Sequence, residues 1–222
     1  MTTTSSLSGL RASVAGAARE LASHGLFIGT AGNVSARAGD VVAVTATGAV
    51  LADATPDQVT VVSLDGRILD GDLRPTSELA LHLGVLRHAG PAASVVHTHA
   101  PAATAVSLVL DELPVIHYQQ LLLGGPVRVA PFHPFGTDEL AGAVGAALDG
   151  RRAALLANHG AVTVGESLAD AVASALLLEW LSELYLRASV VGAPRSLSPA
   201  EQRDVVAHAT RLGYGATKPV NA

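Results

Sequence analysis

The sequence predicts an α/β fold in which a central, mainly antiparallel sheet lies between layers of helices. Short runs rich in β-branched residues alternate with longer segments whose apolar residues follow helical spacing. An Asp65-Gly66 turn between two such runs is typical of a β-hairpin, which is an antiparallel unit. With 222 residues, 49% of them hydrophobic, the chain can bury a sizeable core. Antiparallel strands with helices on the faces fit this sandwich better than a doubly wound parallel sheet.

The first part of the chain is expected to form one helix and then a group of strands. Apolar residues recur at helical spacing from Leu10 to Leu21. Because Gly25 follows where a helix typically ends, we expect a helix over about residues 8–24. A loop of small residues comes next. That loop covers residues 29–33, and the strands are expected at 41–45, 59–63 and 67–69.

The rest of the chain alternates helices and strands. Pro75, with hydroxyl residues after it as caps, predicts a helix start, and the apolar stripe of this helix runs up to Gly90. Pro101 and Pro199 stand at the first-turn positions of two further helices. The remaining helices are expected at 137–148 and about 167–190, and the remaining strands at 93–99, 127–130, 153–157 and 161–164.

Composition limits the class of protein. No internal repeat or long linker divides residues 1–222, so we expect a single domain, with residues 1–6 and 215–222 flexible. Only 15% of the residues are charged and the net charge is -5, which argues against nucleic-acid partners. The chain has no cysteine, and this excludes disulfides and thiolate metal sites. Without a readable signal peptide or an apolar stretch long enough to span a membrane, a soluble cytoplasmic protein is expected.

Histidine is the residue type that points to chemistry. Lysine occurs once, as Lys218 in the tail, which disfavours a Schiff-base enzyme, whereas histidine occurs nine times. Side chains alternate across a strand, so His97 and His99 project from the same face with backbones about 6.6 Å apart. They are close enough to share one metal ion, although a pair at this spacing also arises readily by chance.

Two further candidates lie at the ends of predicted elements. His159 follows a strand and precedes Gly160, which permits close backbone approach, so its ring either points into a cleft or bonds to a turn. Glu78 lies at a helix start and is either a metal ligand or an ordinary first-turn carboxylate. His82, one helical turn further on, is either a partner of these ligands or a surface histidine.

Three short polar segments could bind a phosphate without lysine. They combine glycines, backbone amides and hydroxyls, which act as neutral donors, and one of them lies at a helix start. The segments are Gly29-Thr30-Ala31-Gly32-Asn33, Thr47-Gly48 and Thr76-Ser77. Each alone is better explained as a turn or a cap. There is no Walker sequence or complete dinucleotide fingerprint, so nucleotide binding is not supported.

Together these segments resemble the class II sugar-phosphate aldolase and adducin-head family. The matching motifs extend over nearly the whole chain, in the family's order and at similar spacing. They are Gly29-Thr30-Ala31-Gly32-Asn33-Val34-Ser35-Ala36-Arg37, Thr47-Gly48, Thr76-Ser77-Glu78, Val96-His97-Thr98-His99-Ala100, Ile116-His117-Tyr118, Phe135-Gly136-Thr137 and Asn158-His159-Gly160. Their co-occurrence is specific, whereas each motif alone is not.

The resemblance implies a metal-dependent active site. By it, His97, His99 and His159 would hold a zinc ion, with manganese as the other candidate metal. Glu78 would be both the acid/base and an occasional ligand. The phosphate of the substrate would lie in a pocket made by Gly32, Asn33, Thr47, Gly48, Thr76 and Ser77.

The resemblance also implies an assembly. The family forms ring-shaped tetramers with active sites at subunit interfaces, so Tyr118 would reach the site of a neighbouring subunit in a homotetramer. Phe135 and Tyr214 would line the aldehyde end of the site. The tail at residues 215–219 departs from the family pattern, and so does Thr76, which stands where near relatives carry serine.

The activity implied is a zinc-dependent, reversible cleavage of a ketose 1-phosphate of the L-fuculose phosphate type. Its products would be dihydroxyacetone phosphate and a small aldehyde such as lactaldehyde. A metal-dependent decarboxylase or epimerase of the same superfamily is the alternative, and a non-catalytic adducin-head-like assembly module is a remoter one. Glu78 is a glutamate where the related ribulose-phosphate epimerases have an aspartate, which favours an aldolase over an epimerase.

Overall fold

A computed structural model of the chain describes residues 4–91 and 93–214. Its strands are β1 (Asn33–Ala38), β2 (Val41–Thr45), β3 (Val59–Ser63), β4 (Ile68–Asp70), β5 (Ser94–Thr98), β6 (Glu112–Leu113), β7 (Val127–Ala130), β8 (Ala153–Leu156) and β9 (Gly160–Gly165). Within the described residues these strands form one sheet in the order β4-β3-β2-β1-β5-β9-β8-β7-β6. Neighbouring strands pair antiparallel except β7 and β8, which are parallel.

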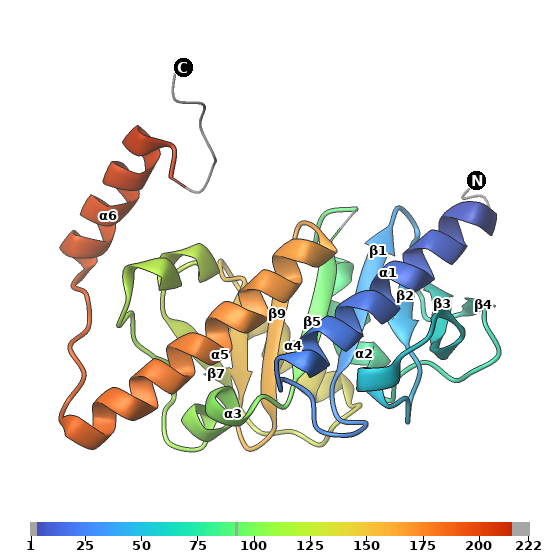
Figure 1. Cartoon of the computed structure of the whole chain (residues 1–222), viewed down its shortest axis with the longest axis horizontal. Coiled ribbons are helices and arrows are strands. Elements are labelled where there is room, and N and C mark those ends of the chain that lie inside the picture. Colours follow the sequence, from blue (N-terminus) through green and yellow to red (C-terminus); the bar gives the residue numbers. More distant parts are fainter. Residues whose placement is uncertain (1–3, 92, 215–222) are drawn as a thin grey trace.

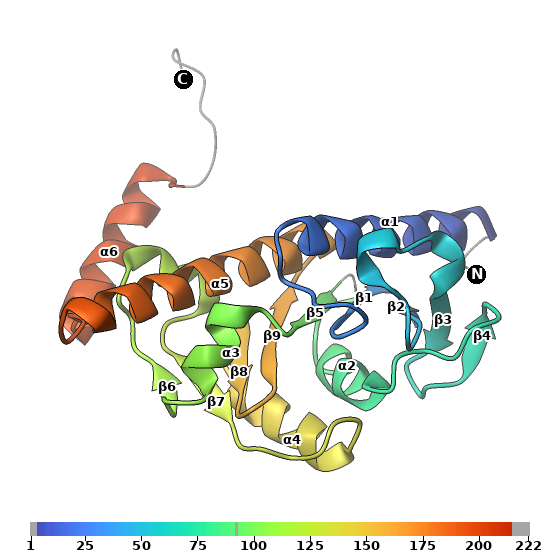
Figure 2. The same ribbon diagram turned by 60° about the horizontal axis from the view of Figure 1, so that its bottom comes forward.

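Helices cover both faces of the sheet. They are α1 (Thr4–Ser23), α2 (Leu79–Leu86), α3 (Pro101–Ser107), α4 (Asp138–Ala147), α5 (Leu168–Val191) and α6 (Pro199–Leu212), together with the 3-10 helices η1 (Leu51–Asp53), η2 (Pro56–Gln58) and η3 (Tyr118–Leu123). Helices α1, α3 and α5 lie on one face, and α2 and α4 lie on the other (Figures 1 and 2). The predicted α/β fold with a mainly antiparallel sheet between helical layers is confirmed.

Strand alternation divides the core into two apolar clusters. In β5, Val95 packs on the α2 and α4 side with Leu86 and Leu140, whereas its neighbour Val96 packs on the α1 and α5 side with Leu178. All five of these side chains are buried. Because each strand position contributes to one layer or the other, the central strands are fixed in register from both faces.

Most predicted elements are confirmed, and two strands were missed. The predicted hairpin is the antiparallel β3–β4 pair. The strand β1 was not predicted because Ser35, Ala36 and Arg37 have weak strand preference. It forms because β2 and β5 pair with it on both sides. The two-residue strand β6 is too short to leave a pattern in the sequence.

The predicted start of the helix at Pro75 is wrong. Helix α2 begins at Leu79, and no side chain caps it. Pro75 pairs with Ala46 in an isolated bridge, and the Thr76 N–H donates to the Thr45 carbonyl at 3.0 Å. These bonds hold the segment in an extended form beside β2, so its hydroxyl groups are not used as helix caps.

The end of the described chain lies away from the sheet. Helix α6 buries no side chain and projects from the body beyond the end of α5 (Figure 1). The expected flexibility of residues 1–3 and 215–222 lies outside the described residues, and residues 4–6 form the first turn of α1. None of the described helices has the length and apolar character needed to cross a membrane.

Candidate active site

Three strands in the middle of the sheet place the predicted histidines. His97 lies in β5, opposite Asn33 of β1 and Val162 of β9, and it is fully buried. His99 follows directly after the end of β5. His159 lies in the turn between β8 and β9. Because β5 runs antiparallel to β9, the C-terminal end of β5 lies beside the N-terminal end of β9.

The turn that carries His159 depends on an unusual backbone. Asn158 adopts a left-handed conformation with φ of 56°. A Cβ atom on Gly160 would lie 2.2 Å from the carbonyl oxygen of Thr98, so only glycine lets this turn approach β5 so closely. The close approach predicted at Gly160 is confirmed, and it brings the His159 ring toward the other two.

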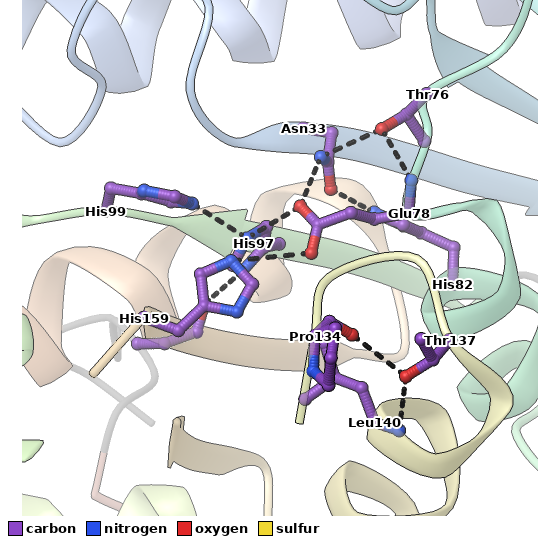
Figure 3. Close-up of polar contacts among 11 residues, drawn as sticks. Asn33, Thr76, Glu78, His82, His97, His99, Pro134, Thr137, Leu140 and His159 are labelled. Carbon is purple, nitrogen blue, oxygen red and sulfur yellow. Dashed lines mark hydrogen bonds and ion pairs between the residues drawn. The ribbon is translucent and has the colours of Figure 1, made fainter. Parts of the chain in front are cut away.

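The three imidazole rings form a nearly equilateral group. Their centroids are 4.8 to 4.9 Å apart and their planes are tilted by 67° to 82°. Glu78 lies against them, with Oε2 at 2.9 Å from His97 Nε2 and Oε1 at 3.4 Å from His159 Nε2 (Figure 3). The ligand-type atoms of the four residues all lie within 4.8 Å of one another. The structure therefore brings together all four residues predicted to hold the metal.

The hydrogen-bond pattern fits a cation. His97 Nδ1 lies 3.0 Å from the carbonyl oxygen of Ala161, which can only accept, so Nδ1 carries the hydrogen. The unshared pair of His97 Nε2 then faces Glu78 Oε2 and, at 3.1 Å, His99 Nε2. Only a cation or a proton between these atoms can satisfy them.

The separations also match a metal site. Adjacent ligand atoms around a tetrahedral zinc ion lie about 3.4 Å apart, which is close to the distances observed here. Glu78 Oε1 is buried and accepts no hydrogen bond from the described residues. The four residues thus fit a divalent metal.

The electrostatic environment favours the metal-binding forms of these groups. The pKa of His99 is lowered to about 4, mainly by burial and in smaller part by the neighbouring His97 and His159. Burial likewise lowers the pKa of His159. For Glu78, burial raises the pKa, but contacts with His97, Asn33 and His159 lower it by more, to about 2. At neutral pH the His99 and His159 rings are therefore neutral and the Glu78 carboxylate is ionised.

A polar network links Glu78 to the sheet. Asn33 Nδ2 donates to Glu78 Oε2 at 3.1 Å and to Thr76 Oγ1 at 3.0 Å, and Asn33 Oδ1 lies 2.5 Å from His82 Nε2 (Figure 3). His82 is fully buried and is not a surface histidine. Its spacing of four residues from Glu78 was the available signal. What the sequence could not show is that Asn33 lies between them.

A cavity of about 710 Å³ opens beside the four residues. Glu78, His99 and His159 line it, and so do all the residues predicted for the phosphate pocket together with one predicted for the aldehyde end. These are Gly32, Asn33, Thr47, Gly48, Thr76, Ser77 and Phe135. Among the described residues that line this cavity there is no lysine or arginine. Any phosphate held here would therefore be bound by neutral donors, with hydroxyl groups and the start of α2 available.

One wall of the cavity was missed from the sequence. Phe132, His133 and Pro134 line it beside the predicted Phe135. Thr137 fixes this loop, because its hydroxyl donates to the Pro134 carbonyl at 2.8 Å and accepts from the Leu140 N–H at the start of α4 (Figure 3). A run of proline and aromatic residues between a strand and a helix was the only signal for this wall.

The structure does not bring Tyr118 or Tyr214 into this cavity. Tyr118 starts η3 and Tyr214 follows α6, and their hydroxyl groups lie 3.2 Å apart. Both side chains are about half exposed, at 42% and 54%. Within one chain these two tyrosines therefore belong to a second surface between η3 and α6.

The sequence model described as class II aldolase and adducin N-terminal domain matches residues 12–186. The chain belongs to this family. It therefore contains a class II aldolase domain, and the predicted resemblance is confirmed.

Curated relatives and a solved structure of the class II aldolase family extend the match. A 5-methylthioribulose-1-phosphate/5-deoxyribulose-1-phosphate aldolase of Rhodospirillum rubrum is 35% identical over 211 residues, 95% of each protein. An L-fuculose phosphate aldolase of Escherichia coli is 36% identical over 188 residues, 84% of this chain and 87% of that protein. A solved L-fuculose 1-phosphate aldolase superposes with a TM-score of 0.85 at 27% identity, covering 91% of this chain and 96% of that one.

These relatives define the class of enzyme. The chain is a class II aldolase, an aldehyde-lyase, with a site that suggests a divalent metal. The predictions of an enzyme and of a metal-binding group are confirmed at this level.

Proposed function

We propose that this aldolase reversibly cleaves a ketose 1-phosphate to dihydroxyacetone phosphate and a small aldehyde such as lactaldehyde, using zinc. The observation that carries the proposal is the convergence of three imidazoles and one carboxylate beside a cavity with neutral donors for a phosphate. The relatives support it, since they are named as aldolases of sugar phosphates of this kind. Nitrogen-rich ligands favour zinc, and manganese is the other candidate.

The chain's residues divide the work between binding and proton transfer. When bound, the divalent ion supplies Lewis acidity that stabilises negative charge on the ketose oxygens. Gly32, Thr47, Gly48 and Ser77 would orient the phosphate with their amides and hydroxyls, with Asn33 and Thr76 on the buried side of the pocket.

Glu78 would be the acid/base of the reaction. In the cleavage direction the aldol hydroxyl loses its proton to a base and the carbon-carbon bond breaks. The bonding electrons stay on the dihydroxyacetone phosphate half. Glu78, which is ionised at neutral pH, would first take up a proton, from solvent or from the base that deprotonated the hydroxyl, and would then give it to that carbon. Its Oε1 atom suits this role because no described residue donates a hydrogen bond to it, and the Glu78 residue lines the cavity.

Tyr118 would act in the site of a neighbouring subunit, on the aldehyde oxygen. It is exposed and lies outside the cavity of its own chain, and Tyr214 lies next to it, so both could be delivered to another copy. A homotetramer with its sites at the subunit interfaces would satisfy this requirement. Phe135, which is 70% exposed at the cavity, would line the aldehyde end.

A cleavage screen tests the activity. The purified protein is incubated with L-fuculose 1-phosphate, D-ribulose 1-phosphate, 5-deoxyribulose 1-phosphate and 5-methylthioribulose 1-phosphate, and dihydroxyacetone phosphate is measured. We expect release from at least one of them and none from a His97→Ala, His99→Ala double variant. Carbon dioxide from carboxylated sugar phosphates, with no cleavage of any ketose 1-phosphate, would instead identify a decarboxylase.

Metal analysis tests the site independently of the substrate. Protein prepared without chelator should contain about one divalent ion per chain, and the same double variant should contain almost none. Equal zinc in both proteins would remove the site as proposed.

A further inference from the structure

His82 is a buried histidine that neither joins the four metal-type residues nor lines the cavity. It lies on α2, with no exposed surface. Its Nδ1 atom is 2.6 Å from Ser35 Oγ and its Nε2 atom is 2.5 Å from Asn33 Oδ1. Both ring nitrogens are therefore used inside the protein, and both partners lie on β1.

The partners of His82 determine where its hydrogen lies. The amide oxygen of Asn33 can only accept, so His82 Nε2 must donate to it. Burial lowers the pKa of His82 to about 3, so the ring is neutral at ordinary pH and Nδ1 is left without a hydrogen. Nδ1 then accepts from the Ser35 hydroxyl. With its hydrogen on Nε2, His82 has a hydrogen-bond partner at both ring nitrogens.

The Glu78 carboxylate, which can only accept, fixes the direction of the Asn33 side chain. A carboxamide can turn by half a rotation with little change of shape, so its direction depends on its partners. Here the two amide hydrogens point to Thr76 Oγ1 and Glu78 Oε2. In the reversed direction the amide oxygen would face the Glu78 carboxylate, and this contact between two acceptors would be repulsive. His82 would also have to move its hydrogen from Nε2 to Nδ1 to keep both of its bonds.

Asn33 in turn holds the candidate acid/base from two sides. Its bond to Oε2 fixes one carboxylate oxygen, while Thr76 Oγ1, which Asn33 also contacts, accepts the backbone N–H of Glu78 at 3.2 Å. All three polar positions of the Asn33 side chain bond to protein. Its carboxamide therefore contacts Glu78 directly, on the wall of the cavity.

We propose that His82 is a positioning residue, which locks the Asn33 carboxamide so that Glu78 is held with Oε1 free for proton transfer. This inference rests on the proposed function for the part that concerns catalysis. The hydrogen bonds that hold the Asn33 carboxamide are all within the protein and do not depend on a substrate. Residues that orient groups around a metal site typically change metal affinity or activity by about 10- to 100-fold when they are lost.

Two substitutions at this position separate the lock from the packing. The amide nitrogen of a glutamine reaches about as far as His82 Nε2, so His82→Gln keeps a donor to Asn33. His82→Leu fills similar volume without a donor. Leu83→Ala is the matched packing control, because Leu83 is buried on the same helix and faces the apolar cluster around Leu86.

The first measurement is the side-chain amide signal of Asn33 in NMR spectra of metal-free protein. Wild type and His82→Gln should each give one pair of slowly exchanging amide hydrogens. In His82→Leu we expect rapid exchange or a second pair from the reversed direction. An unchanged Asn33 signal in folded His82→Leu overturns the lock, and this result does not depend on any activity.

The second measurement is steady-state cleavage of whichever ketose 1-phosphate the wild type accepts, at full metal loading. His82→Leu should lose about 10- to 100-fold in kcat, with KM changed by less than about threefold, and His82→Gln should recover most of the loss. Leu83→Ala should lower Tm and keep kcat. Equal losses in both His82 variants, or a loss confined to KM, would contradict the proposal.

The test still decides if the wild type is inactive or if His82→Leu does not fold. If the wild type cleaves no substrate, the proposed function fails, and the Asn33 spectrum of the metal-free protein still decides the lock. If His82→Leu does not fold, His82→Asn replaces it, because its shorter amide reaches Ser35 but not Asn33. A kcat for His82→Asn equal to that of His82→Gln would then overturn the proposal.

Discussion

At the scale of single residues, the two carboxylate oxygens of Glu78 have different surroundings. Oε2 contacts His97 and Asn33, whereas Oε1 has His159 at 3.4 Å and no hydrogen bond from the described residues. One oxygen is thus held by protein groups, and under the proposed function the other is the one that would exchange a proton with the substrate.

Glu78→Gln removes the proposed acid/base while it keeps the shape of the side chain. We expect the metal to remain bound through the three histidines and kcat to fall by about 100-fold or more. Metal content and initial rates check this together. Glu179→Gln is the matched control, because Glu179 accepts from the N–H groups of Ala102 and Ala103 at the start of α3, away from the cavity. Near-normal turnover in Glu78→Gln would reduce the carboxylate to a structural role.

His82 also predicts how the stability of the metal-free protein depends on pH. Its pKa is about 3 in the folded state, below the usual 6.5 that applies when the chain is unfolded. The neutral form is therefore favoured by folding. The stability due to this group is fully present above pH 6.5 and declines as the pH falls toward 3, by about 1.4 kcal/mol per pH unit.

Urea unfolding at pH 7, 6 and 5 measures this dependence. Because His99 and His159 shift in the same direction, the informative quantity is the difference between wild type and His82→Gln. The variant should lose less stability between pH 6 and 5, by about 1 kcal/mol. Parallel curves for the two proteins would mean that His82 takes up a proton as readily in the folded state as in the unfolded chain.

At the scale of elements, the β8–β9 turn depends on the missing side chain of Gly160. Gly160→Ala would force the added carbon against the Thr98 carbonyl, and the turn would have to move away from β5. We expect a loss of roughly 2 to 3 kcal/mol in the free energy of unfolding, together with weaker metal binding because His159 moves with the turn. Chemical denaturation and metal titration measure both effects.

Gly145→Ala provides the control for this substitution. Gly145 lies in α4 and no atom lies within 4 Å of the position of an added Cβ. This variant should gain about 0.5 to 1 kcal/mol because alanine favours a helix more than glycine does. If both variants had the same stability, close approach at Gly160 would not be the cause.

Elements were predictable where one periodicity dominated. The helices around Leu10 to Leu21 and residues 167–190 and the β-branched strand Val59–Ser63 are recognisable from local pattern alone. Strand β1 was not, because Ser35, Ala36 and Arg37 gain their structure from β2 and β5, which are distant in sequence. The late start of α2 has the same kind of cause, since Thr76 is held by Thr45.

The candidate site likewise contains residues that the sequence indicated and relations that it could not indicate. The strand spacing of His97 and His99 and the position of His159 before Gly160 were readable signals. The resemblance to a family, rather than spacing, was what joined them to Glu78. The relation of His82 to Asn33 was not readable, because it crosses from α2 to β1 and depends on burial. The aromatic wall at Phe132 carried no pattern specific enough to predict it.

At the scale of the whole molecule, one chain lacks part of the site we propose. Tyr118 and Tyr214 contact each other outside the cavity, on the side where η3 and α6 meet. If Tyr118 acts in a neighbouring copy, dissociated protein should lose nearly all of its activity. Sedimentation velocity with parallel assays across a dilution series checks this expectation. A fully active monomer would exclude the shared site.

Helix α6 gives the proposed assembly a second consequence. The helix has 14 residues and buries none of its side chains within the described chain, yet isolated helices of this length are marginal in water. The capping box at Ser198 and Glu201 holds its first turn, but caps alone supply little. The far-ultraviolet ellipticity of this protein should therefore weaken on dilution, so that a spectroscopic signal of local melting reports how many copies remain associated.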